Sequence, residues 1–318
     1  MLVALHHAAS GLGPAATAAW IAAGASLLTL LGSAGMQAFG IRRVSKDTNA
    51  NVRQQLAEER VRSLNERFAT AADRLGADQP AVRLAGVYAM AGLADDWQES
   101  RQTCVDVLCA YVRMPYEPDP GEAAPAAERL AFRASQQVRH TAIRVIADHL
   151  RPGAATPWQG LRFDFRGARF DGGDFLHVEF SDGEVIFSRA EFADGDFHFS
   201  GAEFSGSTVY FQESQFSGGT VSFSYAKFSG GQVDFLNAEF SGADVYFFNA
   251  EFSGGQVSFP SSYFSGGQVY FDDAKFSGGQ VDFGDVRTWS KPPSFDFTGA
   301  PPPGVTMPPD PLVESAAD

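Results

Sequence analysis

The sequence predicts an α+β protein, in which a transmembrane helix and an all-α region precede a four-sided parallel β-helix of about 24 residues per coil. Three observations lead to this prediction. Residues 1–41 of the 318-residue chain contain no Asp, Glu, Lys or Arg. Residues 42–151 show helical periodicity, and most of the second half repeats a twelve-residue pattern rich in Phe and Gly.

The N-terminal stretch is the candidate membrane segment. Residues 1–14 are predicted to be a short tail, and residues 15–41, AATAAWIAAGASLLTLLGSAGMQAFGI, are long enough to cross a bilayer. A cleaved signal peptide carries positive charge before its apolar stretch, whereas MLVALHH has none. Arg42, Arg43 and Lys46 follow the stretch, so we expect a single-pass protein of the cell membrane with its C-terminal domains in the cytoplasm. A buried soluble helix is the alternative.

Residues 42–76 are predicted to form an amphipathic stalk helix. Apolar residues fall on one face and charged residues largely on the others. The apolar face consists of Val52, Leu56, Leu64, Phe68 and Leu75. The stalk and the transmembrane helix each offer a surface through which the chain could form a homo-oligomer.

Residues 77–151 are predicted to be a helical domain. Helices are expected from Pro80, from about Ser100 and from about Ala124, with a Pro-rich loop over residues 114–128. The stretch AVRLAGVYAMAGLA resembles HEAT-like or armadillo-like repeats, and that resemblance implies a surface that binds protein partners. Cys104 and Cys109 are too awkwardly spaced within one helix for a disulfide, so we expect two buried, reduced thiols.

Two interleaved series of Phe define the second half. Each series advances by twelve residues, and the two alternate at gaps of seven and five. Two positions before each Phe stands Ala or Ser in the first series and an apolar residue, Val in all but one case, in the second. A separation of two places both side chains on one face of a strand. So short a strand buries its face only by stacking on copies of itself, which predicts a parallel β-helix with Gly in its corners. The series are Phe192, Phe204, Phe216, Phe228, Phe240, Phe252, Phe264 and Phe276, and Phe187, Phe199, Phe211, Phe223, Phe235, Phe247, Phe259, Phe271 and Phe283.

The number of residues per coil follows from the outward side chains. A coil of twelve residues would twice stack Glu on Glu, whereas a coil of 24 gives a column in which Glu and Lys alternate. Like charges on neighbouring strands are unfavourable, so the longer, four-sided coil is preferred. The alternating column is Glu203, Lys227, Glu251 and Lys275.

The AxFxx and VxFxx units resemble the pentapeptide-repeat family. GARFDGGDF, at residues 167–175, advances by five residues from Phe to Phe, and NAEFSG, at residues 237–242, matches the family pattern A(D/N)LXX best. The resemblance implies a right-handed quadrilateral β-helix, here over residues 158–299, whose corners are enlarged because every second unit gains two residues. Trp158 is expected to close the first coil and Trp289 the last, and residues 300–318 are expected to form a disordered Pro-rich tail.

No catalytic, cofactor-binding or metal-binding site is predicted. His140 and His149 are nine residues apart, too far for a helical metal pair, and no anion-binding loop accompanies the neighbouring arginines. Asp95 and Asp96 are expected to face water, Asp272 and Asp273 to be corner residues, and His177 and His198 to lie on an outer face; the arginines and the residues that depart from the repeat complete the set considered. That set is Asp95, Asp96, Arg139, Arg144, Arg151, His177, His198, Tyr225, Phe248, Asp272 and Asp273.

Charge and architecture together limit the function. Residues 160–318 hold 8 Lys+Arg and 23 Asp+Glu, whereas residues 1–159 hold 16 and 15. The acidic half should repel nucleic acid, so direct nucleic-acid binding is not expected. We expect a non-catalytic, membrane-tethered scaffold that binds a protein partner not identified by the sequence. The family resemblance leaves a second option, a DNA mimic that modulates an enzyme such as gyrase, and a β-helix enzyme of unknown reaction is the third.

Overall fold

The computed structural model describes residues 51–297 and 299–309. The chain divides into two compact units, Met1–Ser63 and Leu64–Asp318. Residues 51–75 are helical, which agrees with the predicted stalk over the part that is described. No helix of the described residues has the length and apolar character needed to span a membrane. The predicted transmembrane segment, residues 15–41, lies outside the described residues.

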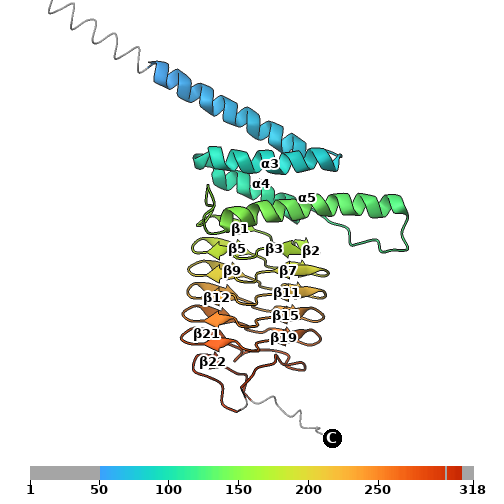
Figure 1. Cartoon of the computed structure of the whole chain (residues 1–318), viewed down its shortest axis with the longest axis vertical. Coiled ribbons are helices and arrows are strands. Elements are labelled where there is room, and N and C mark those ends of the chain that lie inside the picture. The colour runs from blue at the N-terminus through green and yellow to red at the C-terminus, as the bar shows by residue number, and fades with distance from the viewer. Residues whose placement is uncertain (1–50, 298, 310–318) are drawn as a thin grey trace, which may run out of the picture. The chain divides into compact units, whose positions relative to one another are not determined.

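Three further helices follow, at positions close to the predicted ones (Figure 1). α3 is Pro80–Asp96, α4 is Arg101–Arg113 and α5 is Ala126–Leu150, and a short 3-10 turn, Gln98–Ser100, joins α3 to α4. Proline sets two of these boundaries: Pro80 occupies the first turn of α3, and Pro125 precedes α5. The loop between α4 and α5 therefore covers residues 114–125 and ends before the predicted residue 128. The HEAT-like character of the region stays a prediction.

The helical region has a hydrophobic core. α3 packs against α4 and α5, and the apolar faces of all three bury their Val, Leu, Ile and Ala side chains. Cys104 and Cys109 are buried here and free, as expected. Burial raises the pKa of the Cys104 thiol to about 11 and that of Cys109 to about 12, so both thiols are protonated and unreactive near neutral pH.

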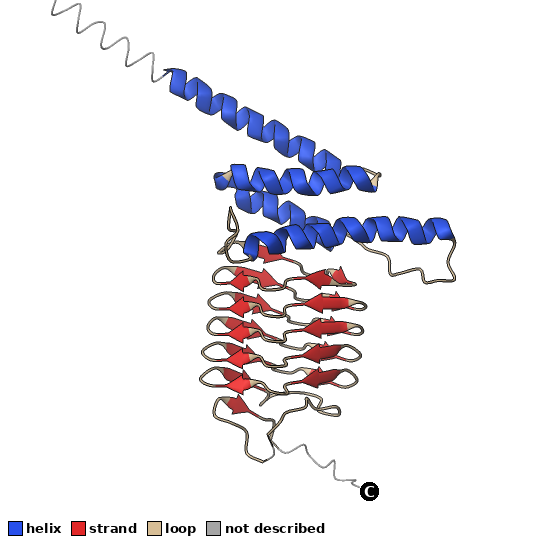
Figure 2. Cartoon of the chain, in the orientation of Figure 1, coloured by secondary structure: helices blue, strands red, loops and turns tan. Residues whose placement is uncertain are grey.

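The second half is a four-sided parallel β-solenoid with one sheet on each side (Figure 2). Sheet A contains β1 (Arg162–Asp164), β5 (Glu184–Ile186), β9 (Thr208–Tyr210), β13 (Gln232–Asp234), β17 (Gln256–Ser258), β21 (Gln280–Asp282) and β22 (Val305–Thr306). Sheet B contains β2 (Arg169–Phe170), β6 (Glu191–Phe192), β10 (Gln215–Phe216), β14 (Glu239–Phe240) and β18 (Tyr263–Phe264).

The other two sheets complete each coil. Sheet C contains β3 (Gly173–Asp174), β7 (Asp196–His198), β11 (Thr220–Ser222), β15 (Asp244–Tyr246) and β19 (Gln268–Tyr270). Sheet D contains β4 (Glu179–Phe180), β8 (Glu203–Phe204), β12 (Lys227–Phe228), β16 (Glu251–Phe252) and β20 (Lys275–Phe276). From β1 to β21, consecutive strands along the chain thus belong to different sheets, and each strand as far as β17 pairs with the strand four places on; β22 is the exception, because it pairs with β21.

The strand register confirms the coil of 24 residues. Phe228 pairs with Phe204 on one side and with Phe252 on the other, and Val233 pairs with Val209 and Val257. The first step is shorter on two sides: Phe170 pairs with Phe192, 22 residues away. The hand of the coil stays a prediction.

Columns of Phe fill the solenoid. Within a column, copies in successive coils lie nearly parallel, as in Phe204–Phe228, with ring centroids 4.8 Å apart and planes 5° apart. Between columns the rings tilt or meet edge to face, as in Phe211–Phe223 at 83°. The spacing within a column equals the spacing between paired strands, so each ring covers the face of its copy. This arrangement explains why the chain repeats Phe at the same two positions.

The short corners carry a conformation that the sequence analysis did not predict. The residue two positions after each Phe of the second series, from Phe187 to Phe271, has a positive φ, from 54° at Asn237 to 65° at Gly201. Glycine and asparagine adopt this left-handed conformation most readily. The chain nevertheless places Arg, Glu, Tyr, Ser and Asp at several equivalent corners, where a small backbone strain is expected.

In the long corners, glycine is required by close contact. A Cβ atom at Gly242 would lie 2.2 Å from the Ser217 carbonyl oxygen of the preceding coil. The equivalent glycine of every later corner meets a backbone oxygen in the same way. The corner therefore fits against the previous coil only without a side chain at this position.

Both ends of the solenoid are covered. Trp158 is fully buried at the first coil, and Trp289 packs edge-on against Phe264 and Phe283 at the last. Residues 300–309 differ from the predicted disordered tail, because Val305 and Thr306 form β22 and pair with β21. This strand covers the last edge of sheet A, which would otherwise present unpaired backbone groups.

Candidate functional site: the helix–solenoid junction and the aromatic strip

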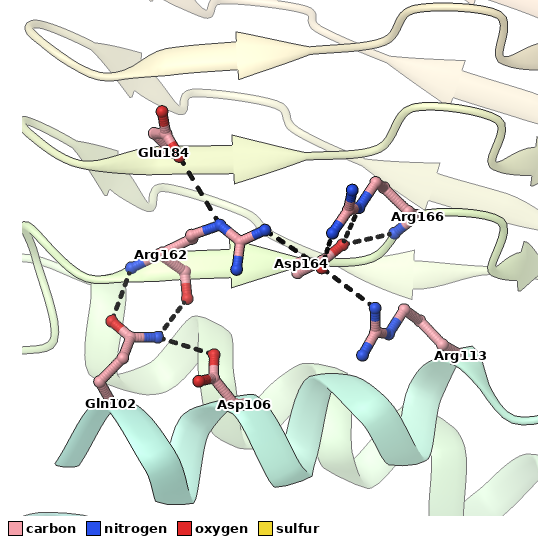
Figure 3. A network of polar contacts seen from close by, with 7 residues as sticks. All are labelled: Gln102, Asp106, Arg113, Arg162, Asp164, Arg166 and Glu184. Carbon is pink, nitrogen blue, oxygen red and sulfur yellow. Dashed lines mark hydrogen bonds and ion pairs between the residues drawn. The ribbon is translucent and has the colours of Figure 1, made fainter. Parts of the chain in front are cut away.

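Asp164 of β1 joins the helical region to the first coil (Figure 3). It accepts hydrogen bonds from Arg113 of α4 at 3.0 Å and from Arg166 at 2.7 Å, and Arg162 lies 3.4 Å away. Its side chain is only 7% exposed. Burial alone would raise the pKa of Asp164, but the hydrogen bonds and charges of Arg166 and Arg113 hold it below its usual value. The carboxylate therefore stays charged and connects two elements far apart in sequence.

Gln102 of α4 pairs with the open edge of β1. Its Nε2 donates to the Arg162 carbonyl oxygen at 2.7 Å, and its Oε1 accepts from the Arg162 backbone N–H at 3.0 Å (Figure 3). These are the two bonds that a neighbouring strand would make. α4 thus caps the first strand of sheet A and prevents another chain from pairing there.

A second polar cluster surrounds Asp171. The Asp171 carboxylate accepts hydrogen bonds from the Tyr116 hydroxyl and from Gln136, both at 2.8 Å, and lies 2.9 Å from His140 Nε2. Burial opposes the charge on Asp171, but the hydrogen bonds from His140, Tyr116 and Gln136 lower its pKa to about 2. The cluster joins the 114–125 loop, α5 and the first coil.

Arg139 reinforces this junction from the buried side. It is 4% exposed, and its guanidinium donates to the Val112 carbonyl oxygen at 2.6 Å and to the Arg169 carbonyl oxygen at 2.7 Å. The guanidinium also lies 4.2 Å from the centre of the Tyr116 ring. These contacts bind the end of α4 to β2, so the helices and the first coil hold one another in place.

His149 does not meet His140. Its ring stacks on Trp158 at 3.9 Å between centroids, and Asp95 accepts from Trp158 Nε1 at 3.0 Å and lies 3.2 Å from His149 Nε2. His140 thus contacts Asp171 of the first coil, whereas His149 contacts Trp158, which covers that coil. Asp96 pairs with Arg67 at 2.6 Å. Each of these residues thus contacts another part of the fold.

Phe248, one of the residues that depart from the repeat, belongs to an exposed aromatic cluster. It lies 5.0 Å from the Tyr246 ring and 5.7 Å from the Tyr270 ring, and the two tyrosines stack at 5.0 Å. We call Tyr246, Phe248 and Tyr270 the aromatic strip. All three are half-buried on the outer surface of sheet C and its corner. Burial, followed by the charge of Asp244, raises the pKa of Tyr246, so its hydroxyl remains a donor.

The charge columns agree with prediction over the predicted range. Lys275 Nζ lies 3.0 Å from Glu251, and Lys227 pairs in register with Glu203 and Glu251. One coil earlier, however, Glu179 pairs with Glu203, so like charges do become neighbours at this place. Both are outward-facing and partly exposed, where water reduces the repulsion.

The remaining candidate residues lie apart from one another. Asp272 accepts a hydrogen bond from Ser294 at 3.0 Å, and the Asp273 backbone N–H donates to Asp296. His177 and Tyr225 occupy left-handed corners. Arg144 donates to the Tyr88 hydroxyl and Arg151 binds Asp174. Within the described residues, no group of His, Cys, Asp or Glu is arranged to hold a metal ion.

No sequence motif marks Asp164, Asp171 or Tyr116 as junction residues. One signal was available: Asp171 follows Phe170 at the position where most later coils have Ser. Departures from the repeat in the first coil mark the residues that meet the helices. Their partners, 31 to 55 residues away, carry no local pattern.

Comparison with known proteins assigns the repeat. Residues 199–251 match a family model described as pentapeptide repeats (9 copies). No curated protein and no solved structure gives a significant match. The matched residues lie within the four-sided coils described above, from the end of β7 to the start of β16. Residues 199–251 of the four-sided β-solenoid therefore match pentapeptide repeats, and a helical region precedes the solenoid.

Proposed function

We propose that this protein is a non-catalytic, membrane-tethered scaffold that binds a protein partner through the outer face of its solenoid. The aromatic strip is the observation that carries this proposal. Three half-exposed aromatic rings lie together on sheet C, whereas the neighbouring coil has Ser222 at the equivalent position of the tyrosines. Aromatic residues are enriched where proteins bind one another.

The fixed junction supports a scaffold role. Asp164, Asp171 and Arg139 connect the helices to the first coil, so a partner bound on the solenoid is held at a set distance from the helical region. Asp244 beside the strip and the acidic balance of the second half favour a partner with Lys or Arg at the contact.

Membrane attachment is part of the proposal and rests on residues 15–41 and on the positive residues that follow them. We propose a cell-membrane protein with the helical region and solenoid in the cytoplasm. Extraction of cell membranes with alkaline carbonate should leave the full chain in the pellet and release a variant lacking residues 1–41. Protease added to intact cells should spare the solenoid; digestion from outside would reverse the orientation.

The partner surface is tested by cross-linking in cells followed by detergent solubilisation and capture of the tagged full chain. The matched variant is Tyr246→Ser with Tyr270→Ser, because Ser222 and Ser294 already occupy the same column. A partner captured with the native chain and with Lys227→Ala, but lost with the double variant, supports the proposal. Equal recovery with all three chains contradicts it.

The two alternative functions, a DNA mimic and a β-helix enzyme, are less well supported. An acid column that mimics DNA would be unbroken, whereas Lys227 and Lys275 interrupt the column of sheet D. At the end of the solenoid, the Asp272 carboxylate accepts a hydrogen bond from Ser294, and the Asp273 backbone N–H donates to Asp296. Neither pattern favours mimicry or catalysis.

A further inference from the structure

Two adjoining hollows lie on the helical region, away from the aromatic strip. The first, of about 160 Å³, is lined by Arg83, Tyr111, Tyr116, Ser135 and Arg139, among others. The second, of about 420 Å³, is lined by prolines and by Tyr116 and Phe132, with Glu117 and Glu128 also on its wall, and it shares Pro115, Tyr116 and Ser135 with the first. A polar hollow thus opens beside an apolar one.

The polar hollow holds two guanidinium groups that form no ion pair within the described part of the chain. Arg83 donates to the backbone carbonyl oxygens of Ala77 at 3.3 Å and Asp78 at 3.1 Å and also interacts with the Tyr111 hydroxyl, and its Nε is buried without a partner. Arg139 likewise donates to backbone carbonyl oxygens. The carboxylate whose charge acts on Arg139 is that of Asp171, and its oxygens already accept hydrogen bonds from three other side chains.

The wall shared by the two hollows is held in place from several sides. The Tyr116 hydroxyl donates to Asp171 at 2.8 Å, its ring stacks on Phe132 at 5.6 Å, and Arg139 covers the ring at 4.2 Å. A ligand would therefore meet a surface that needs little reordering, which favours binding. Two arginines that form no ion pair thus lie beside a fixed aromatic wall, so their positive charge is available to an anion in the hollow.

We propose that these hollows form one binding site for a small organic oxyanion with an apolar body. The oxyanion, a carboxylate or a phosphate monoester, binds Arg83 and Arg139, with the hydroxyls of Tyr111 and Ser135 available as further donors. The apolar body lies along Phe132 and the prolines of the 114–125 loop. This site is independent of the scaffold surface on the solenoid.

The experiment is calorimetric titration of the purified full-length protein in detergent with four probes: hexanoate, hexyl phosphate, inorganic phosphate and hexanol. At least one of the first two should bind, and hexanol should bind at least about tenfold more weakly because it lacks the charge that the arginines recognise. Inorganic phosphate should also bind at least about tenfold more weakly, because it lacks the apolar body. Comparing hexanoate with hexyl phosphate shows whether the site prefers a carboxylate or a phosphate monoester.

Two variants and a control locate the binding. Arg83→Gln should weaken the better charged probe by about tenfold or more, and Phe132→Ser should weaken it while leaving inorganic phosphate unchanged. Arg144→Gln, on the same helix as Arg139 but bound only to Tyr88, should leave every affinity as it was. Each variant is first checked for the native far-ultraviolet circular dichroism. Equal binding of hexanol and the charged probes, or unchanged affinity in Arg83→Gln, would overturn the proposal.

Discussion

Phe228 and Phe252 stack with ring centroids 4.7 Å apart and planes 3° from parallel, in strands that pair residue for residue. Both side chains are essentially fully buried. Phe228 also stacks on Phe204 of the preceding coil, so its ring has a copy on each face. The core of the solenoid is therefore a set of continuous columns in which each interior ring stacks on two copies.

Removing one ring should open a cavity that the columns cannot close. We expect Phe228→Ala to lower the free energy of unfolding by about 3–5 kcal/mol. Lys227→Ala, on the same strand but facing water, should change it by no more than about 0.5 kcal/mol. Urea unfolding followed by circular dichroism measures both, and comparable losses in the two variants would contradict the inward direction of Phe228.

Gly242→Ala tests the close contact in the long corners. The added methyl group would meet the Ser217 carbonyl oxygen at 2.2 Å, so one coil must move from the next at a cost of about 1–3 kcal/mol. Gly92 in α3 is the matched control because a Cβ there meets nothing within 4 Å. Gly92→Ala should raise stability by up to about 1 kcal/mol. Opposite signs of the two changes are the expected result of thermal unfolding.

Charge reversal at Lys275 tests the column on sheet D. Lys275 pairs with Glu251 at 3.0 Å, so Lys275→Glu should cost up to about 1 kcal/mol, and the cost should shrink in high salt. Adding Glu251→Ala should remove most of the extra cost, because the new carboxylate at position 275 then has no like charge on the paired strand. A double-mutant cycle measures the coupling, and a coupling energy of zero at low salt would mean that the two side chains do not interact in solution.

The Asp171 cluster predicts a loss of stability in acid. Its hydrogen bonds lower the pKa of Asp171 from the ordinary 3.8 to about 2, so their stabilisation is fully present above pH 3.8 and is lost as pH falls toward 2. A shift of this size corresponds to about 2 kcal/mol. Asp171→Asn should be less stable than the native chain at pH 6, and its stability should fall less between pH 4 and pH 2. Parallel pH dependences in the two proteins would contradict the assignment.

The left-handed corners predict a stabilising substitution. Tyr225 has a φ of 59° and is 65% exposed, while Asn237 occupies the equivalent corner of the next unit. Tyr225→Asn should therefore raise the free energy of unfolding by about 0.5–1 kcal/mol. Ser253→Asn, in an exposed long corner where φ is not positive, should have no such effect. A lower melting temperature for Tyr225→Asn would show that the corner carries no strain of this kind.

The solenoid could be predicted in detail because its contacts repeat. The Phe series reports the inward positions directly, and the alternation of Glu203, Lys227 and Glu251 distinguished a coil of 24 residues from one of twelve. The same logic did not extend to Glu179, because the first coil departs from the repeat where it meets the helices. The left-handed corners were missed because Arg, Glu and Tyr occupy them as well as Asn.

The junction could be predicted only in outline. Pro80 and Pro125 indicated where helices begin, and Trp158 was expected to close the first coil. The Asp171 cluster joins a loop, a helix and a coil through side chains that have no sequence motif in common. Such contacts depend on the tertiary arrangement, and periodicity contains no information about them. The ordered strand at Val305 was missed for the opposite reason, because a Pro-rich composition concealed a pairing segment.

The central claim is that positions 24 residues apart lie on neighbouring strands. The most direct measurement is disulfide formation, under mild oxidation, in the double variant Lys227→Cys with Glu251→Cys. These positions pair in register, and strands about 4.8 Å apart allow the bond. The native Cys104 and Cys109 are buried and do not compete. We predict rapid cross-linking in this variant and none in Lys227→Cys with Glu239→Cys, twelve residues apart and in different sheets. Preferential cross-linking of the second pair would contradict the four-sided coil.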